Sequence, residues 1–106
     1  MISVASQKLL EIADLLEREP ALWCKQIDED RNITAEWDHS EWRRPNSRCP
    51  TCLWGWVLRR VPRLKDREEV THRIARVIGT VFLTDWNDVP ERTVAQVVDV
   101  CRKAAA

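Results

Sequence analysis

The chain has 106 residues, enough for one domain with little left over for a second. Its 17 basic and 17 acidic residues give a formal net charge of zero. This balance excludes a protein that is basic over its whole length and an acidic solubilising tail. No apolar run reaches the roughly 18 residues that a membrane span needs, and the N-terminus shows no signal peptide. We therefore expect a single cytoplasmic domain over residues 1–106 that does not contact a membrane.

Residues 3–19 predict the first helix. Ala5, Leu9, Ile12 and Leu16 recur at helical spacing and mark one apolar face. Ser3 is placed to cap the start, and a proline at position 20 ends the helix because its ring clashes with the preceding turn. This face is the first part of the expected core.

Residues 22–48 lack a helical period. Residues 33–37 alternate between apolar and polar side chains, which is typical of a β-strand, and a polar cluster at 28–32 separates them from the apolar stretch 22–27. We expect a small β-hairpin or a pair of short strands here. Residues 37–51 then form a variable loop or insertion.

Three further helices follow. Residues 52–61 predict the second, with Trp54 on its buried stripe, and residues from 66 onward the third, with a capping box at its start. Gly79 is a plausible end of that helix, although Val77 and Val81 continue its stripe. Residues 80–84 suit either a short strand or a helical extension, and residues 85–90 suit a turn. The last helix starts at a second capping box, Thr93 with Gln96.

The expected fold class is therefore α+β and mostly α. About four helices surround one core, with a small β-hairpin between the first and second helices.

The zero net charge hides an uneven distribution. Residues 1–42 sum to −6, residues 43–67 to +7 and residues 68–106 to −1. The basic block either folds against the acidic first third or forms an anion-binding face. The candidate partner-binding residues combine this block with neighbouring tryptophans: Trp37, Trp42, Arg43, Arg44, Arg48, Arg59, Arg60 and Arg63.

The six tryptophans divide into two groups. Trp23, Trp54 and Trp86 suit the core, where tryptophan supplies the bulk that tyrosine and phenylalanine otherwise would. Trp37, Trp42 and Trp56 remain available for a partner. Aromatic side chains interleaved with arginine are typical both of a single-strand nucleic-acid surface and of a protein-interface hot spot.

Cys49 and Cys52 have the C-x-x-C spacing of metal ligands or a redox pair, and Cys24 is a candidate third ligand. No second closely spaced ligand pair exists, so a zinc site stays a minor alternative and no cofactor is expected. Catalysis has little support either. The two histidines, His39 and His72, have no arrangement that sequence adjacency can establish as catalytic, and we expect no enzyme.

One set of motifs in order carries a resemblance: Trp23-Cys24, then Cys52-Leu53-Trp54-Gly55, then Trp86-Asn87-Asp88. It resembles a family of small actinobacterial and actinophage proteins of unknown function, over nearly the whole chain. The resemblance implies a fold and a source but no activity. The motif residues have structural roles available: Gly55 permits a close approach, Asn87 and Asp88 bond within their turn, and Trp86 anchors that turn.

The leading hypothesis is a small protein-interaction module, regulatory or host-modulating, plausibly phage-encoded, whose partner is a protein. A nucleic-acid binder that uses the same Trp/Arg surface is the first alternative, and a small zinc-binding module that uses Cys24, Cys49 and Cys52 is the second. The sequence indicates neither the partner nor the oligomeric state.

Overall fold

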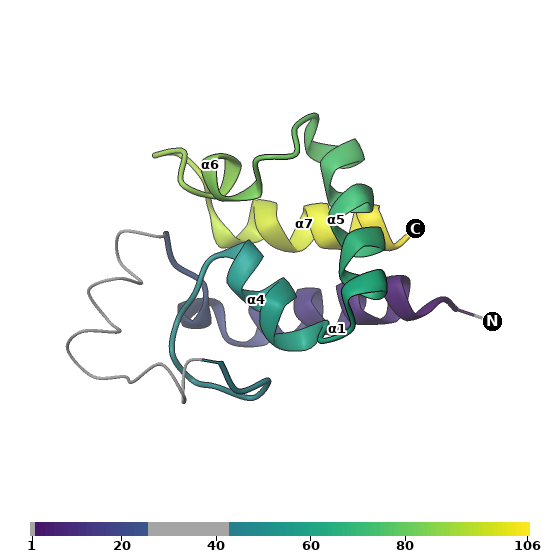
Figure 1. The fold of residues 1–106 in the computed structure, drawn as a ribbon. Helices are drawn as coiled ribbons and strands as arrows, with labels where there is room; N and C mark the ends of the chain where they lie inside the picture. The colour runs from purple at the N-terminus through teal and green to yellow at the C-terminus, as the bar shows by residue number, and fades with distance from the viewer. Residues whose placement is uncertain (1, 26–42) are drawn as a thin grey trace.

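The computed structural model describes residues 2–25 and 43–106. These residues form helices and no β-strand, which confirms the mostly α class (Figure 1). In chain order the elements are α1 (Val4–Arg18), the short 3₁₀ helix η1 (Pro20–Leu22), α4 (Leu53–Arg60), α5 (Leu64–Ile78), α6 (Leu83–Asn87) and α7 (Val94–Ala105).

Helices α1 and α7 lie side by side and run in opposite directions, so both chain ends meet at one end of the molecule (Figure 1). Both helix starts follow the sequence prediction. The Ser6 N–H donates to Ser3 Oγ at 3.1 Å, and Thr93 and Gln96 form the capping box of α7. Ser6 Oγ also donates to the Ala105 carbonyl at 2.8 Å. The first and last turns of the chain are therefore tied together.

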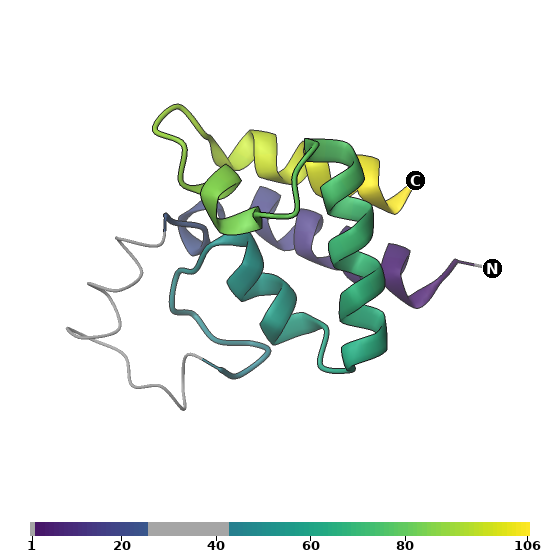
Figure 2. The same cartoon turned by 45° about the horizontal axis from the view of Figure 1, so that its top comes forward.

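Helix α5 packs against α1 and α7 across the end where the termini lie (Figure 2). It ends at Gly79, which has a φ of 79°, as predicted for a residue that must adopt the left-handed conformation. Its start differs from the prediction, because α5 begins at Leu64 and no side chain caps it. Val77 is exposed, because α5 buries only a narrow face that includes Val70 and Ile74. Val81 lies beyond the end of α5 and is exposed as well.

The described residues do not support the predicted β-hairpin. Trp23 instead forms an isolated parallel bridge with Thr51. The Cys24 N–H donates to the Thr51 carbonyl and the Thr51 N–H to the Leu22 carbonyl, both at 3.1 Å. These backbone groups pair across a long sequence separation and leave no antiparallel ladder with a neighbouring strand. Residues 33–37, the second half of the predicted hairpin, lie outside the described residues.

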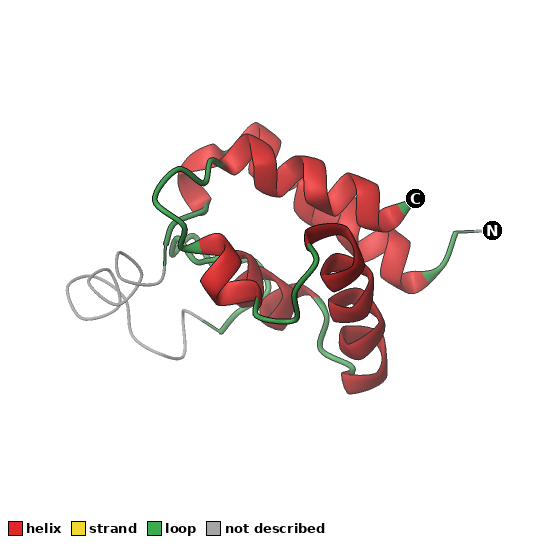
Figure 3. Cartoon of the chain, turned by 90° about the horizontal axis from the view of Figure 1, so that it is seen from above, coloured by secondary structure: helices red, strands yellow, loops and turns green. Residues whose placement is uncertain are grey.

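Residues 80–90 also differ from the prediction. The chain forms the short helix α6 over Leu83–Asn87, separated from α5 by a connection at residues 79–82 (Figure 3). The strand alternative for residues 80–84 is therefore wrong, and the turn predicted at residues 85–90 begins only after Asn87. Helix α6 packs on α4, so the two short helices form one layer beside the three long ones.

A single hydrophobic cluster connects these elements. Its largest fully buried side chains include Trp56, Leu9, Ile12, Leu16, Leu53 and Ile74. Within the described ranges, no helix combines the length and the apolar character that crossing a membrane requires.

Candidate functional site

Asn87 joins three segments of the chain from a fully buried position. Its Oδ1 accepts hydrogen bonds from Trp23 Nε1 at 2.6 Å and from the Leu53 N–H at 3.0 Å. Its Nδ2 donates to the Cys24 carbonyl at 3.2 Å and to Asp88 Oδ1 at 3.0 Å. We call these five residues the Asn87 hub. The motif residues thus act structurally, because Asn87 satisfies a backbone donor in the first turn of α4 that has no partner within that helix.

Gly55 has the close-approach role expected of it. A Cβ atom at this position would lie 2.8 Å from Thr51 Cβ and would overlap Thr51 Oγ1. The Thr51 side chain therefore occupies the space that the Cβ atom of any larger residue at position 55 would need. Thr51 also carries the bridge to Trp23, so Gly55 helps to fix the Asn87 hub.

Trp86 is anchored by Arg92. The guanidinium carbon of Arg92 lies 3.8 Å from the centroid of the Trp86 ring, and Arg92 Nε donates to the Trp86 carbonyl at 3.0 Å. A cation stacked on an indole face is favourable. Trp86 also packs against the core cluster. Its contacts with Arg92 and with the core therefore both hold α6 in place.

The two tryptophans of α4 depart from the prediction at Trp56. Trp56, expected to face a partner, is fully buried and donates from Nε1 to the Leu22 carbonyl at 2.9 Å. Trp54, expected in the core, is partly buried and packs against the core cluster. The reason is the direction of α4, which presents Trp56 and Val57 to the core and leaves Trp54 beside α5 and α6.

The predicted basic surface is divided by the fold. Arg59 is 2% exposed and donates to the Cys49 carbonyl at 2.8 Å, with its guanidinium carbon 4.7 Å from the Trp56 ring centroid. Its assignment to a partner-binding surface is therefore wrong, because it fastens the 43–50 segment to α4 instead. Arg60 is half-buried beside the same ring.

Four arginines of the predicted surface remain exposed. Arg48 pairs with Glu19 at 2.5 Å and Arg63 with Asp66 at 4.0 Å, so the basic block meets the acidic first third at one point only among the described residues. Arg43 and Arg44 are exposed and make no ion pair with a described residue. Trp37 and Trp42 lie outside the described residues.

The three candidate metal ligands are not assembled by the described part of the chain. Cys49 and Cys52 are buried and Cys24 is half-buried. Within residues 2–25 and 43–106, no group of three or more histidine, cysteine, aspartate or glutamate side chains is close enough to hold a metal ion. His72 is exposed, and His39 lies outside the described residues.

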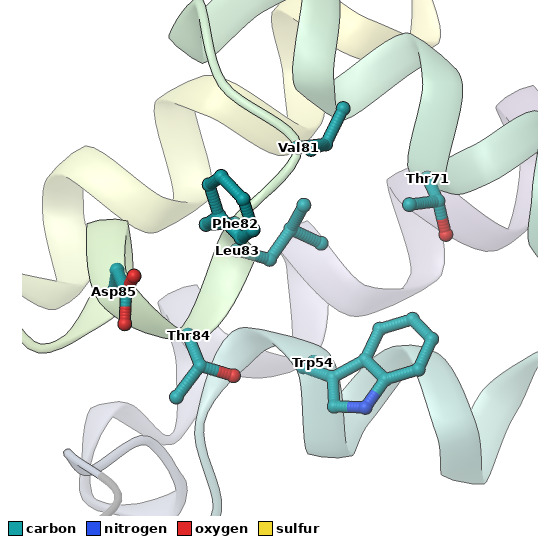
Figure 4. A pocket seen from close by; sticks show the side chains of 7 residues that line it. All are labelled: Trp54, Thr71, Val81, Phe82, Leu83, Thr84 and Asp85. Carbon is teal, nitrogen blue, oxygen red and sulfur yellow. The ribbon is translucent and has the colours of Figure 1, made fainter.

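A hollow that the sequence did not predict lies where α4, α5 and α6 meet. One part, of about 290 Å³, is lined by Trp54, Thr71 and residues 81–85 (Figure 4). A second part, of about 400 Å³, is lined by Trp54 and Thr71 again, together with Leu64, Arg67, Glu68 and His72. Because both parts share Trp54 and Thr71, we treat them as one surface, the Trp54 groove, defined by Trp54, Leu64, Arg67, Glu68, Thr71, His72 and residues 81–85.

The Trp54 groove exposes an unusual amount of apolar surface. Val81 is 68% exposed, Phe82 66% and Leu64 65%, and the Trp54 ring forms the wall between them. Most monomeric proteins keep such side chains apart, and contiguous exposed apolar patches mark interaction sites. The sequence held one indication of this surface. Val81 and Phe82 follow Gly79, beyond the end of the helix, where a helical stripe cannot bury them.

Residues 3–106 match a sequence profile described as a family of unknown function (DUF6197). No curated protein matches the chain. No solved structure matches it either.

Proposed function

We propose, since the chain belongs to the DUF6197 family of unknown function, that it is a small non-enzymatic protein-interaction module that binds a partner protein through the Trp54 groove. One observation carries the proposal: three large apolar side chains, Leu64, Val81 and Phe82, are each about two-thirds exposed around one tryptophan. A partner that covers them converts exposed apolar area into buried area.

The energetic argument favours a protein as the partner. Fully burying a leucine, valine or phenylalanine side chain contributes about 1.5–3 kcal/mol. Tryptophan is among the residues that most often carry the binding energy of protein interfaces. Trp54 and Leu64 belong to helices, and Val81 and Phe82 to the short connection between α5 and α6, so little conformational entropy is lost when a partner binds.

Site-specific photo-cross-linking tests the proposal. A photoreactive phenylalanine analogue is placed at Phe82, and in a matched control at Gln7, an exposed residue of α1 outside the groove. In lysate of the cells that encode the protein, we expect a discrete protein adduct from position 82 only. Leu64→Ser should weaken that adduct in a double variant. Identical adducts from both positions, or none from position 82, would contradict the proposal.

The exposed basic residues support a second candidate function, nucleic-acid binding. Arg43 and Arg44 make no ion pair with a described residue, so they are free to contact phosphates. Such binding weakens steeply with salt. The test is a titration with single-stranded DNA and RNA at low and high salt, comparing the protein with its Arg43→Ala/Arg44→Ala variant. An unchanged affinity in the variant would show that Arg43 and Arg44 do not contribute to nucleic-acid binding.

An origin in an actinobacterium or an actinophage remains part of the proposal. It is supported by the order of the Trp23-Cys24, Cys52–Gly55 and Trp86–Asp88 motifs and by the excess of arginine over lysine. A phage-encoded member of the family would act on a host protein. The cross-linking experiment in host lysate addresses this directly, because it identifies the adduct.

A further inference from the structure

We infer that the occupant of the Trp54 groove is a basic amphipathic segment of the partner protein, with an apolar side chain against Trp54 and lysine or arginine side chains beside Glu68 and Asp85. This inference rests on the proposed function and adds the chemistry of the partner. Three properties of the groove carry it: the charge at its two ends, the hydrogen-bonding state of Trp54 and the apolar wall between them.

The carboxylates of the described residues divide into those that form an ion pair and those that do not. On α1, α5 and α7 and just after α1, most acidic side chains lie within 4.0 Å of a lysine or arginine nitrogen: Glu11, Asp14, Glu17, Glu19, Asp66, Glu69 and Asp99. Glu68 and Asp85 make no ion pair with a described residue, and both line the groove. The groove therefore carries two carboxylates without an ion pair to a described residue, and Glu91, on the connection between α6 and α7, is a further one outside the groove.

The single arginine of the groove, Arg67, makes no ion pair with Glu68 or Asp85. Arg67 directs its Nε to the Val61 carbonyl at 3.1 Å and its Nη2 to the Pro62 carbonyl at 3.3 Å. Its guanidinium therefore holds the connection between α4 and α5, away from Asp85 on α6. An incoming cation thus meets a carboxylate at each end of the groove, and complementary charge of this kind sets specificity and orientation.

The Trp54 indole N–H adds a hydrogen-bond donor to the apolar wall of the groove. It makes no hydrogen bond with a described residue, in contrast to Trp23 and Trp56, whose Nε1 atoms donate to Asn87 and Leu22. Figure 4 shows the ring at the border of the hollow, with its nitrogen on the edge turned away from Val81 and Leu83. A buried indole N–H normally finds an acceptor. A partner segment that covers Trp54 supplies one from a carbonyl oxygen.

The apolar wall fixes what lies between the charges. The side chains of Val81, Phe82 and Leu64 border the two parts of the groove, and each part has room for an apolar side chain of the segment. An amphipathic helix carries apolar residues at spacings of three and four. In a basic one, lysine or arginine occupies the positions between them. A basic amphipathic helix therefore matches the groove in both respects.

Nuclear magnetic resonance with defined peptides tests the inference. The probe is a synthetic peptide of about 14 residues with leucine at helical spacing and lysine elsewhere. Its counterparts are the same peptide with glutamate in place of lysine and one with scrambled order. We expect the lysine peptide to shift the Trp54 indole N–H resonance, assigned with Trp54→Phe, and the amide resonances of residues 64–72 and 81–85. It should bind at least about tenfold more tightly than either counterpart.

Charge reversal is the decisive variant. Glu68→Lys/Asp85→Lys should reverse the preference toward the glutamate peptide, and each single variant should weaken the lysine peptide about three- to tenfold. The matched control, Glu11→Lys/Asp99→Lys, changes two carboxylates of α1 and α7 outside the groove and should leave the preference unchanged. The single variants keep the test available if the double variant does not fold, and the amide spectrum reports folding directly.

The remaining outcomes separate this inference from the proposed function. Equal binding of all three peptides, or none, would overturn the basic occupant, while a protein adduct at position 82 would still support the interaction module. A dimer in light scattering that Phe82→Ser abolishes would assign the groove to a second copy and overturn the inference. Displacement of the lysine peptide by single-stranded RNA, together with shifts at the groove, would assign it to nucleic acid and overturn it as well.

Discussion

The two faces of α4 differ in burial and in hydrogen bonding. Trp56 on the inner face is fully buried, and its indole N–H is bonded to the Leu22 carbonyl. Trp54, two residues earlier, borders the Trp54 groove and makes no hydrogen bond with a described residue. The inner face packs into the core beside the Asn87 hub, whereas the outer face borders the groove. The same residue type therefore serves stability on one side of α4 and is available for binding on the other.

Replacing the two tryptophans by leucine should give the largest contrast. Trp56→Leu removes a buried ring and one of the two hydrogen-bond donors to the Leu22 carbonyl, the other being the Thr51 N–H, so we expect a loss of about 3–5 kcal/mol in the free energy of unfolding. Trp54→Leu should cost less than about 1 kcal/mol, since its ring is partly exposed. Urea unfolding measures both. Similar losses from the two variants would remove the distinction between the faces.

The Asn87 hub should be the next most sensitive feature. Asn87→Ala leaves buried donors at Trp23 and Leu53 without an acceptor, so we expect a loss of about 2–4 kcal/mol. Asn46→Ala, at an exposed position of the 43–50 segment, is the matched control and should change stability by less than about 0.5 kcal/mol. Equal unfolding midpoints for the two variants would show that the hub does not hold α4 and α6 together.

The two glycines should separate lack of space from backbone strain. Gly55→Ala forces a Cβ into the Thr51 side chain, and we expect a loss of about 2 kcal/mol. Gly79→Ala meets open space but a φ of 79°, so we expect about 1 kcal/mol from strain alone. Gly79→Asn should recover part of the second loss, because asparagine tolerates this conformation. Asparagine would not relieve the clash at Gly55, because the space there is filled by Thr51. Thermal unfolding should rank the losses in the same order.

The loss of stability at alkaline pH should test the burial of Cys101 on α7. Burial raises the pKa of this thiol from 9.0 to about 12, so the folded state favours the neutral form. The associated stability is fully present below pH 9.0 and is lost as pH rises toward 12, by about 1.4 kcal/mol for each pH unit. Cys101→Ala should lose less stability over this interval than the parent protein. Parallel pH profiles for the two proteins would contradict the buried position of the thiol.

Local patterns predicted the parts of the fold that depend on neighbouring residues. The cap at Ser3, the capping box at Thr93 and the helix end at Gly79 were correct, because each involves residues within one turn of a helix. The buried stripe of α1 was correct for the same reason. The hairpin was not, because Trp23 and Thr51 pair across 27 intervening positions that no local pattern connects.

The candidate site was less predictable than the fold. Arg59 was assigned to a surface because arginine is usually exposed, but the Cys49 carbonyl and the Trp56 ring provide a buried place for its charge. Arg43 and Arg44 are exposed as expected. Leu64, Phe82 and Glu68 belong to the Trp54 groove through the packing of α4, α5 and α6, and their positions in sequence do not suggest that they meet.

Hydrophobic periodicity and capping in the sequence were enough to predict the mostly helical class, the starts of α1 and α7, the end of α5 at Gly79 and the residues that pack along α1 and α7. Only the tertiary structure decided which tryptophan of α4 is buried, which arginine is internal and where exposed apolar surface gathers. The physical reason is that the rotation of α4 against the core is set by contacts with Leu22, Thr51 and Asn87. The contacts with Leu22 and Asn87 each join residues 34 positions apart along the chain, and a turn of one helix by two residues exchanges its inside for its outside.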